Sequence, residues 1–374
     1  MSRVYLDWNA TAPLRPEARV AMLAAIDVVG NPSSVHAEGR AAKAIVERAR
    51  AQVARLVGCD AGEVVFTSGA TEAAGLVLRS HIDAVCVSDA EHDAVYEQAR
   101  GVRQTVFARP GESGRHPDSA FDDRSAEIDL TGGLFAVAAA NGETGVVEDA
   151  PRIAGRAASV EAGFLTDAVQ VIGKMAFHFR AVGADYALCS GHKIGAPKGT
   201  GALLLKAGVD LPAPVPGGGQ EMGRRSGTEN VIGIAGFGAA AEAALRDLEA
   251  GIWERVEKLR NILEESLEAA APELIIFGKE APRLPNTSCF AIPGWKGETQ
   301  VMQMDLGGFA ISAGSACSSG KVKESRVLRA MGFDGLTASS AIRVSMGPTT
   351  TEDEVLGFAR TWTDHYRRWR QRAA

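Results

Sequence analysis

The strongest constraint on the fold is a series of short apolar runs that alternate with helical or polar segments. Parallel strands of one sheet need long crossover connections, so this alternation indicates an α/β domain with a mostly parallel sheet. The segment 37–57 shows the helical half of the pattern, with apolar residues at helical spacing and Gly58 as a stop signal. The expected strands are 64-VVFT-67, 84-AVCVS-88, 134-LFAVAAA-140, 164-FLTD-167, 185-DYALCS-190 and 201-GALLL-205.

The pattern of apolar and charged residues changes at about residue 248. A long charged helix is expected over 252–270, and shorter strands and helices follow it. Because 374 residues exceed what one hydrophobic core usually holds, we expect a second, smaller α+β domain in this part of the chain. The polar segment 108–130, which contains glycine and proline, is predicted to be a surface connection.

Composition and charge exclude several classes of protein. A net charge of −6 disfavours general nucleic-acid binding, and the basic stretch 366–374 is interpreted as a solvated helix end. The N-terminus has no apolar segment after a basic start, and no window approaches the ~20 apolar residues of a membrane span. A soluble cytoplasmic protein that contacts neither a membrane nor nucleic acid is therefore expected.

The five cysteines form neither an even disulfide framework nor a C-x-x-C pair. We therefore expect no metal site, and reduced thiols in the cytosol. Cys59, Cys86, Cys189 and Cys289 adjoin apolar runs or strand ends and are interpreted as small core residues. Cys317 lies instead among small polar residues and glycines, which is typical of an exposed loop, and its thiol is interpreted as reactive.

Polar residues follow five of the expected strands. In open α/β sheets, ligands bind outside the carboxyl ends of the strands, so these side chains are expected to converge on one site. A charged lysine at the end of a buried strand is costly unless its charge is neutralised or used, which makes Lys193 a candidate for chemistry. The residues, in strand order, are Ser68 to Thr71, then Glu91 and His92, then Asn141, then Asp167 and Gln170, then Ser190, His192 and Lys193.

Each of these features has an ordinary structural interpretation when it is taken alone. The segment 67–78 fits a side-chain-capped helix start, but small residues at a helix N-terminus also hold phosphate. Asp167 could cap a helix, and Lys193 could be an exposed residue in a turn. His92 could be a surface histidine, or a buried one whose hydrogen bonds are all made within the protein. Together they suit the cofactor pyridoxal 5'-phosphate (PLP). Its aldehyde binds an amine as a Schiff base, its ring nitrogen pairs with a carboxylate, and its phosphate binds at a helix N-terminus.

Two further stretches strengthen this interpretation. Arg343 lies inside an otherwise apolar strand, 342-IRVSMG-347, where it fits either an internal salt bridge or a site for a carboxylate ligand. The sequence leaves both possibilities open. The other stretch is 311–332, which contains Cys317.

With these motifs in place, the sequence resembles the cysteine desulfurases of the NifS/IscS type, in the class V aminotransferase family of fold-type I PLP enzymes. The resemblance runs nearly end to end. Gly142 is a departure, because the family usually has a second asparagine there. The motifs are 5-YLDWNATAPLRP-16, 30-GNPSSVH-36, 65-VFTSGATE-72, 90-AEHDAV-95, 140-ANGETGVV-147, 166-TDAVQ-170, 190-SGHKIGAPKGTGAL-203, 217-GGGQEMGRRSGTEN-230, 313-AGSACSS-319 and 342-IRVSMG-347.

The resemblance implies the fold-type I architecture, in which helices flank a mostly parallel, mixed seven-stranded sheet and a smaller α+β domain follows. Residues 14–247 would form the large PLP-binding domain. Residues 1–13 and 248–374 would form the small domain, with the loop of the catalytic cysteine. The family also implies a homodimer, in which Thr228 of the neighbouring subunit completes the phosphate site.

The resemblance also implies a role for each matching residue. Lys193 would hold PLP as a Schiff base and later move the substrate Cα proton. His92 would stack on the ring and assist proton transfer, Asp167 would pair with the ring nitrogen, and Gln170 would contact the ring hydroxyl. The remaining cofactor positions would be Ala70, Thr71, Asn141, Ser190, His192 and Thr228, and the substrate carboxylate would bind Asn141 and Arg343.

The implied reaction uses Cys317 as the nucleophile. Its thiolate would take the sulfur of L-cysteine, releasing alanine and leaving a persulfide for a sulfur-acceptor protein in iron–sulfur cluster assembly or another thiolation. Two alternatives are another class V enzyme, such as a selenocysteine lyase or an aminotransferase, and a non-catalytic sulfur-transfer partner that keeps the fold. Cys317 disfavours the first alternative, and the presence of Lys193, His92 and Asp167 disfavours the second.

Overall fold

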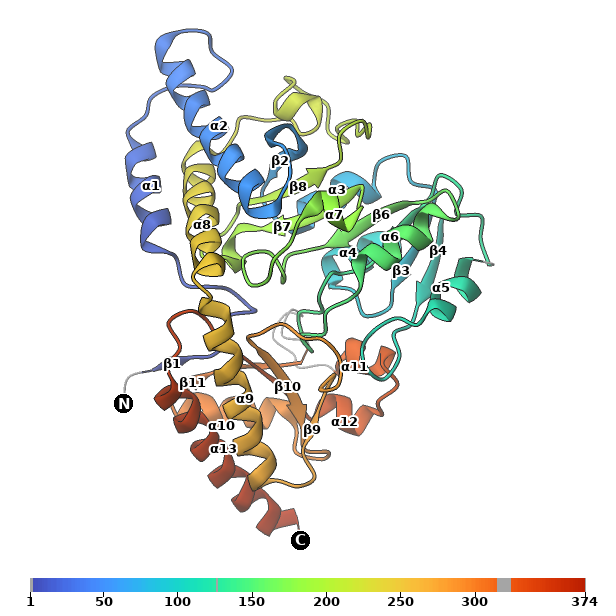
Figure 1. The fold of residues 1–374 in the computed structure, drawn as a ribbon, viewed down its shortest axis with the longest axis vertical. Helices are drawn as coiled ribbons and strands as arrows, with labels where there is room; N and C mark the ends of the chain where they lie inside the picture. The colour runs from blue at the N-terminus through green and yellow to red at the C-terminus, as the bar shows by residue number, and fades with distance from the viewer. Residues whose placement is uncertain (1–2, 126, 315–323, 374) are drawn as a thin grey trace.

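The computed structural model describes residues 3–125, 127–314 and 324–373, so the prediction for Cys317 lies outside the described residues (Figure 1). A seven-stranded sheet forms the centre of the larger part of the molecule. Its strands lie side by side in the order β2 (Val64–Thr67), β8 (Gly201–Leu205), β7 (Tyr186–Ser190), β6 (Gly163–Asp167), β5 (Leu134–Ala136), β3 (Ala84–Ser88) and β4 (Gln104–Ala108). Strand β8 is antiparallel to both neighbours, and the other neighbouring pairs are parallel. The predicted α/β fold with a mixed, mostly parallel seven-stranded sheet is confirmed.

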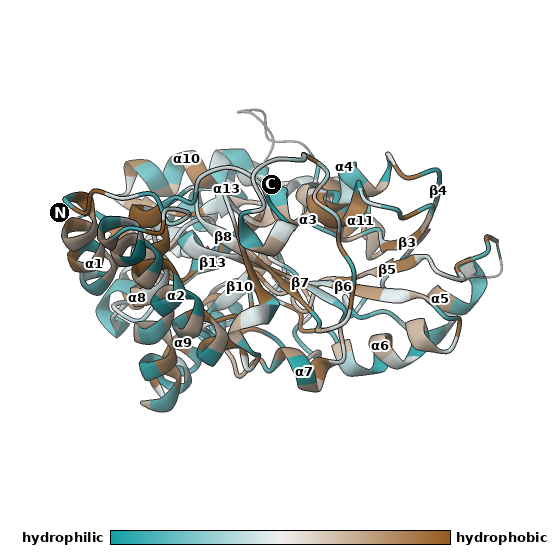
Figure 2. Cartoon of the chain, turned by 90° about the horizontal axis from the view of Figure 1, so that it is seen from above, coloured by the Kyte–Doolittle hydropathy of each residue, from teal (hydrophilic) through white to brown (hydrophobic). Residues whose placement is uncertain are grey.

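Helices cover both faces of this sheet. They are α1 (Pro16–Ile26), α2 (Ala37–Val57), α3 (Ala70–Leu78), α4 (Asp93–Ala99), α5 (Asp118–Ser125), α6 (Ala150–Ala158), α7 (Phe179–Val182) and α8 (Val231–Glu249). One core contains Val53 of α2 and Phe237 of α8, and the core on the opposite face contains Val77 of α3 and Val95 of α4. Because both faces are buried, the central strands are mostly apolar along their length. Figure 2 shows these strands between helices that carry many of the hydrophilic residues, although α1 also has exposed apolar ones.

The local predictions agree with most of these elements. The helix expected over 37–57 is α2, and Gly58 ends it in a left-handed conformation with φ 63°. Strand β4 was not predicted, and the run 134–140 is a strand only as far as Ala136. The segment 108–130 was expected to be a surface connection, and it contains α5 because Phe121 packs in the sheet core with 1% of its surface exposed.

The C-terminal part has its own sheet and core. Its four-stranded antiparallel sheet has the order β12 (Ser312–Ala313), β13 (Ala341–Ser345), β10 (Thr287–Ala291) and β9 (Ile275–Ile276). Its helices are α9 (Ile252–Ala270), α10 (Gly297–Leu306), α11 (Arg326–Ala330), α12 (Gly335–Ser339) and α13 (Glu352–Ala373). The helix predicted over 252–270 is therefore confirmed as α9. The core is rich in aromatic residues and includes Trp295, Trp362 and Phe290.

The N-terminal residues join the C-terminal part. Strand β1 (Val4–Tyr5) pairs in parallel with β11 (Phe309–Ala310), and Leu6 packs in the same core as Trp362. The division of the chain into 14–247 and the two segments 1–13 and 248–374 stays a prediction. Among the helices of the described residues, none is long and apolar enough to cross a lipid bilayer.

Candidate active site

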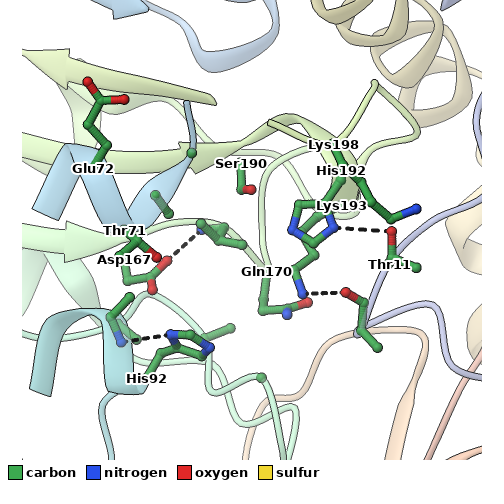
Figure 3. A pocket seen from close by; sticks show the side chains of 18 of the residues that line it. Thr11, Thr71, Glu72, His92, Asp167, Gln170, Ser190, His192, Lys193 and Lys198 are labelled. Carbon is green, nitrogen blue, oxygen red and sulfur yellow. Dashed lines mark hydrogen bonds between the residues drawn. The ribbon is translucent and has the colours of Figure 1, made fainter. Parts of the chain in front are cut away.

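A cavity of about 620 Å³ opens at the carboxyl ends of the parallel strands. Polar side chains from separate strand ends converge there, as the sheet topology requires. Figure 3 shows Asp167 and His92 on one side of the cavity and Lys193 on the other. The predicted site residues that line it are Ala70, Thr71, His92, Asn141, Asp167, Gln170, Ser190, His192 and Lys193.

The start of α3 provides one wall of this cavity. No side chain of the described residues caps this helix, so the ordinary capped-helix interpretation does not apply. The N–H groups of its first turn, together with the Thr71 and Ser190 hydroxyls, form a donor set suited to a phosphate. Gly201 of β8 allows this arrangement, because a Cβ there would lie 2.6 Å from the Cα of Gly69.

His192 follows β7 and borders the same wall. Its Nδ1 lies 3.1 Å from the Thr11 hydroxyl. Burial lowers the pKa of His192 to about 4, and the charges of Lys193 and Lys198 act in the same direction. His192 is therefore neutral at pH 7 in the ligand-free protein and offers a hydrogen bond, not a positive charge, to an anion.

Asp167 and His92 occupy the opposite side of the cavity. The Asp167 carboxylate accepts a hydrogen bond of 2.9 Å from the Val169 amide and caps no helix. Burial raises the pKa of Asp167, while His92 and Lys193 lower it. His92 begins α4, where its Nδ1 accepts a 3.1 Å hydrogen bond from Ala94 N–H, so a neutral ring has its proton on Nε2.

Lys193 reaches the cavity from the short turn Gly191–Lys193 that follows β7. Its Nζ donates to the backbone carbonyls of Asn9 and Ala10, the latter at 2.9 Å. These two carbonyl acceptors hold the amine in place at the edge of the cavity. An amine held in this way is positioned to form an imine.

Two residues of the site, Asn9 and Lys174, were missed by the sequence analysis. Lys174 is buried and donates to the side-chain oxygens of Gln170 at 2.6 Å and Asn9 at 2.9 Å. Burial, with Lys193 and Arg343, lowers the pKa of Lys174 well below its usual range. Because the Gln170 oxygen is occupied, its NH₂ group faces the remaining acceptors, one of which is the Asn9 carbonyl at 3.2 Å. The only sequence signal was the i, i+4 spacing of Gln170 and Lys174.

Asn141 and Arg343 meet around the backbone of Gly142. Asn141 lines the cavity and donates to the Ala90 carbonyl at 3.0 Å. Arg343 of β13 donates to Asp7 at 2.8 Å and to the Gly142 carbonyl at 3.0 Å, so the internal ion pair is present. The buried Nε of Arg343 has no hydrogen-bond partner among the described residues. Its predicted binding of a substrate carboxylate stays a prediction.

Thr228 and the cysteines complete the predicted set. Thr228 is exposed and is not among the described residues that line the cavity. Cys86, Cys189 and Cys289 are buried, and Cys59 is partly exposed, as expected for small core residues. Burial raises the thiol pKa of Cys59, Cys86 and Cys189 to about 12 and that of Cys289 well above its usual value. None of these four described thiols is suited to react as a thiolate at neutral pH.

The donors and acids of this cavity fit PLP. The uncapped helix start suits a phosphate, the buried carboxylate of Asp167 suits a ring nitrogen, and Lys193 supplies an amine. Arg343 is not among the described residues that line the cavity, and its buried Nε has no hydrogen-bond partner.

Comparisons with known proteins agree with this chemistry. The family model described as aminotransferase class-V matches residues 4–358. A cysteine desulfurase of Cereibacter sphaeroides is 40% identical over 370 residues, which cover 95% of this chain and 93% of that protein. The structure of a NifS-like protein from Rickettsia africae ESF-5 has a TM-score of 0.90 at 31% identity and covers 97% of this chain and 99% of that one. A structure of SspA in complex with cysteine has a TM-score of 0.78 at 25% identity, and the match covers 93% of this chain and 100% of that one.

Proposed function

The chain belongs to the aminotransferase class-V family, and we propose that it acts in that family as a PLP-dependent cysteine desulfurase, converting L-cysteine to L-alanine and a persulfide on Cys317. The observation that supports this most strongly is the convergence of Lys193, Asp167 and the uncapped start of α3 on one cavity. The relatives that share nearly the whole chain are cysteine desulfurases, and they do not favour another class V activity.

The residues of the cavity divide the binding of PLP between them. Ala70, Thr71, Ser190 and His192 hold the phosphate, and Asp167 holds the ring nitrogen. Gln170, oriented by Lys174, presents its NH₂ group to the ring hydroxyl. When bound, PLP supplies an aldehyde that condenses with amines and a ring that withdraws electrons from the substrate Cα.

The protein supplies the proton transfers and the nucleophile. Lys193 Nζ removes the substrate Cα proton, His92 assists proton transfer from the other side of the cavity, and Arg343 and Asn141 orient the substrate carboxylate. The Cys317 thiolate then attacks the substrate sulfur. A new S–S bond forms and the Cβ–S bond breaks, with its electron pair left on the carbon fragment. Cβ takes a proton to become a methyl group, and Lys193 returns a proton to Cα, which gives alanine.

Further parts of the proposal concern partners and location. A second copy of the chain would supply Thr228 to the phosphate site, and exposed apolar residues such as Val20, Leu23 and Met222 offer a surface for it. The division into a large domain and a small domain with the Cys317 loop belongs to the same proposal. The persulfide would pass to an acceptor protein in the cytoplasm, for iron–sulfur cluster assembly or another thiolation.

The test is mass spectrometry of the purified protein after incubation with L-cysteine. We expect one added sulfur on the Cys317 peptide and free alanine. Lys193→Ala should remove the visible absorbance of bound PLP, whereas Cys317→Ala should keep it and lose sulfur release. Cys59→Ala is the matched control and should behave as the wild type. Sulfur release that persists in Cys317→Ala would exclude Cys317 as the nucleophile.

A further inference from the structure

The first residue of α11, Arg326, connects the C-terminal part of the chain with the turn between β3 and α4 (Figure 1). Its guanidinium group donates to the backbone carbonyls of Asp89 and Glu91 and bonds Asp93 Oδ1 at 3.1 Å. Its central carbon also lies 3.7 Å from the centroid of the Tyr96 ring. Arg326 therefore contacts one short turn through two carbonyls, a carboxylate and an aromatic face.

This turn contains His92, which lines the active-site cavity. On the side of the large sheet, the turn is held by Glu91, whose buried carboxyl group accepts a hydrogen bond from the Ala138 amide. On the other side, Arg326 fixes the carbonyl of Glu91, which belongs to the peptide group directly before His92. The orientation of the His92 backbone thus depends on contacts from both parts of the chain.

The residue before Arg326 makes a second contact of the same kind. Ser325 is fully buried, and its side chain lies near Glu143, where it lowers the pKa of a carboxyl group that burial raises. Glu143 lies in the turn that begins at Asn141, and its amide donates to the Asn141 side chain at 2.9 Å. Two consecutive residues at the start of α11 therefore contact the two turns that contain His92 and Asn141.

We propose that Arg326 is a positioning residue, which holds the turn containing His92 in register with the cavity. This inference rests on the proposed function, because it concerns the place of His92 in that reaction. A guanidinium group bonds two carbonyls with its planar fork while it stacks on Tyr96, which a lysine ammonium does not do. Misplacing a catalytic group by about 1 Å lowers a rate by roughly a hundredfold.

The test compares Arg326→Ala with Arg329→Ala in the PLP-loaded full-length enzyme. Arg329 is an exposed arginine of the same helix, which pairs with Glu324 and donates to the Phe333 carbonyl. For Arg326→Ala we expect kcat for alanine formation to fall about tenfold to a hundredfold, with a much smaller change in KM. The visible circular dichroism of bound PLP should change as well, while its absorbance is kept. Arg329→Ala should match the wild type in kcat, in KM, and in the circular dichroism and absorbance of bound PLP.

Chemical rescue separates positioning from general stabilisation. Added guanidinium chloride, at concentrations that leave the wild type folded, should restore part of the kcat of Arg326→Ala, and ammonium chloride should not. Arg326→Lys should remain closer to Arg326→Ala than to the wild type. Equal kcat, KM and circular dichroism in Arg326→Ala and Arg329→Ala would overturn the proposal, as would a fall in activity that only follows a loss of folded protein.

Failure of the proposed function gives a different result. A wild-type enzyme that binds PLP but releases no alanine from L-cysteine would reject the proposed function. The circular dichroism of bound PLP in Arg326→Ala would still report whether Arg326 positions the turn. An active wild type with an unaffected Arg326→Ala variant would reject only the positioning role.

Discussion

The cores on the two faces of the seven-stranded sheet differ in side-chain size from the aromatic core of the C-terminal part. Around the seven-stranded sheet the core is mainly alanine, valine, leucine and phenylalanine, and all five tryptophans lie outside residues 14–247. In the C-terminal core, the ring centroids of Trp295 and Trp362 are 5.4 Å apart, and Trp362 stacks on Tyr366 at 5.5 Å. The smaller sheet is thus packed with large aromatic rings.

The difference in side-chain size follows from how closely the backbone segments of each part must approach one another. Small residues let backbones approach closely, as at Gly238 of α8, where a Cβ would lie 2.5 Å from the Cα of Ala49 in α2. The same close packing brings strand ends and the start of α3 against the cavity. The aromatic core instead provides a large buried area in few residues, and it includes Ile342 and Val344, the neighbours of Arg343 in β13. We therefore expect substitutions in the aromatic core to change stability, and substitutions at the cavity to change activity.

The largest expected effect is on stability, for Trp362→Ala. Trp362 is fully buried, and its indole N–H donates to Gln300 at 3.0 Å. Removing the ring leaves a cavity and should lower the free energy of unfolding by about 3–5 kcal/mol, measured by urea denaturation. If the variant does not fold, Trp362→Phe provides the same test with a smaller decrease in the free energy of unfolding. Activity per folded, PLP-loaded molecule should be close to that of the wild type. A large fall in this activity would contradict the expectation that the aromatic core affects stability alone.

The second effect is on activity, for Asp167→Asn at the cavity. An amide does not stabilise a protonated ring nitrogen as a carboxylate does, so kcat should fall on the order of a hundredfold or more. The control is Asp185→Asn, because Asp185 accepts from the Phe164 amide at 3.0 Å and pairs with Lys206, away from the cavity lining. That variant should lose stability and keep its kcat.

Asp167→Asn should also change the pH dependence of stability in the PLP-free protein. Burial raises the pKa of Asp167 in the folded state. A raised carboxyl pKa favours folding most at low pH, and this contribution is lost as pH rises from the unfolded pKa through the folded pKa. The amide that replaces the carboxyl group does not titrate. The variant should therefore not lose this part of its stability when urea denaturation is measured at increasing pH above the unfolded carboxyl pKa of about 4. An identical pH profile in both proteins would argue that Asp167 is not desolvated.

The smallest expected effect is at Gly142, where the family usually has an asparagine. A Cβ at this position would lie 3.2 Å from Gln170 Nε2, so Gln170 must move by a few tenths of an ångström. Gly142→Ala should therefore raise the Kd for PLP modestly, measured by equilibrium dialysis. Gly155→Ala is the control, because no atom lies within 4 Å of a Cβ there and the helix should gain about 0.5–1 kcal/mol. Unchanged PLP binding in Gly142→Ala would show that Gln170 has room to adjust.

Much of the fold was predictable from the sequence. The period of apolar residues and the stop at Gly58 located α2, and the apolar runs located six of the seven strands of the large sheet. Strand β4 was missed because its residues are only partly buried at the sheet edge. Helix α5 was missed because its sequence is polar apart from Ala120 and Phe121, which pack against the core.

The candidate site was predictable only where it follows strand ends. His92, Asp167 and Lys193 each follow an apolar run, so local sequence determined that they meet at one edge of the sheet. Asn9 and Arg326 reach this edge from opposite ends of the chain, and nothing in their local sequence indicates their partners. The sequence thus determined the elements and the chemistry at their ends, because periodicity and turn residues act between near neighbours. The tertiary structure alone decided which distant groups hold Lys193, Gln170 and the His92 turn, because those contacts depend on how the N-terminal and C-terminal segments pack against the large sheet.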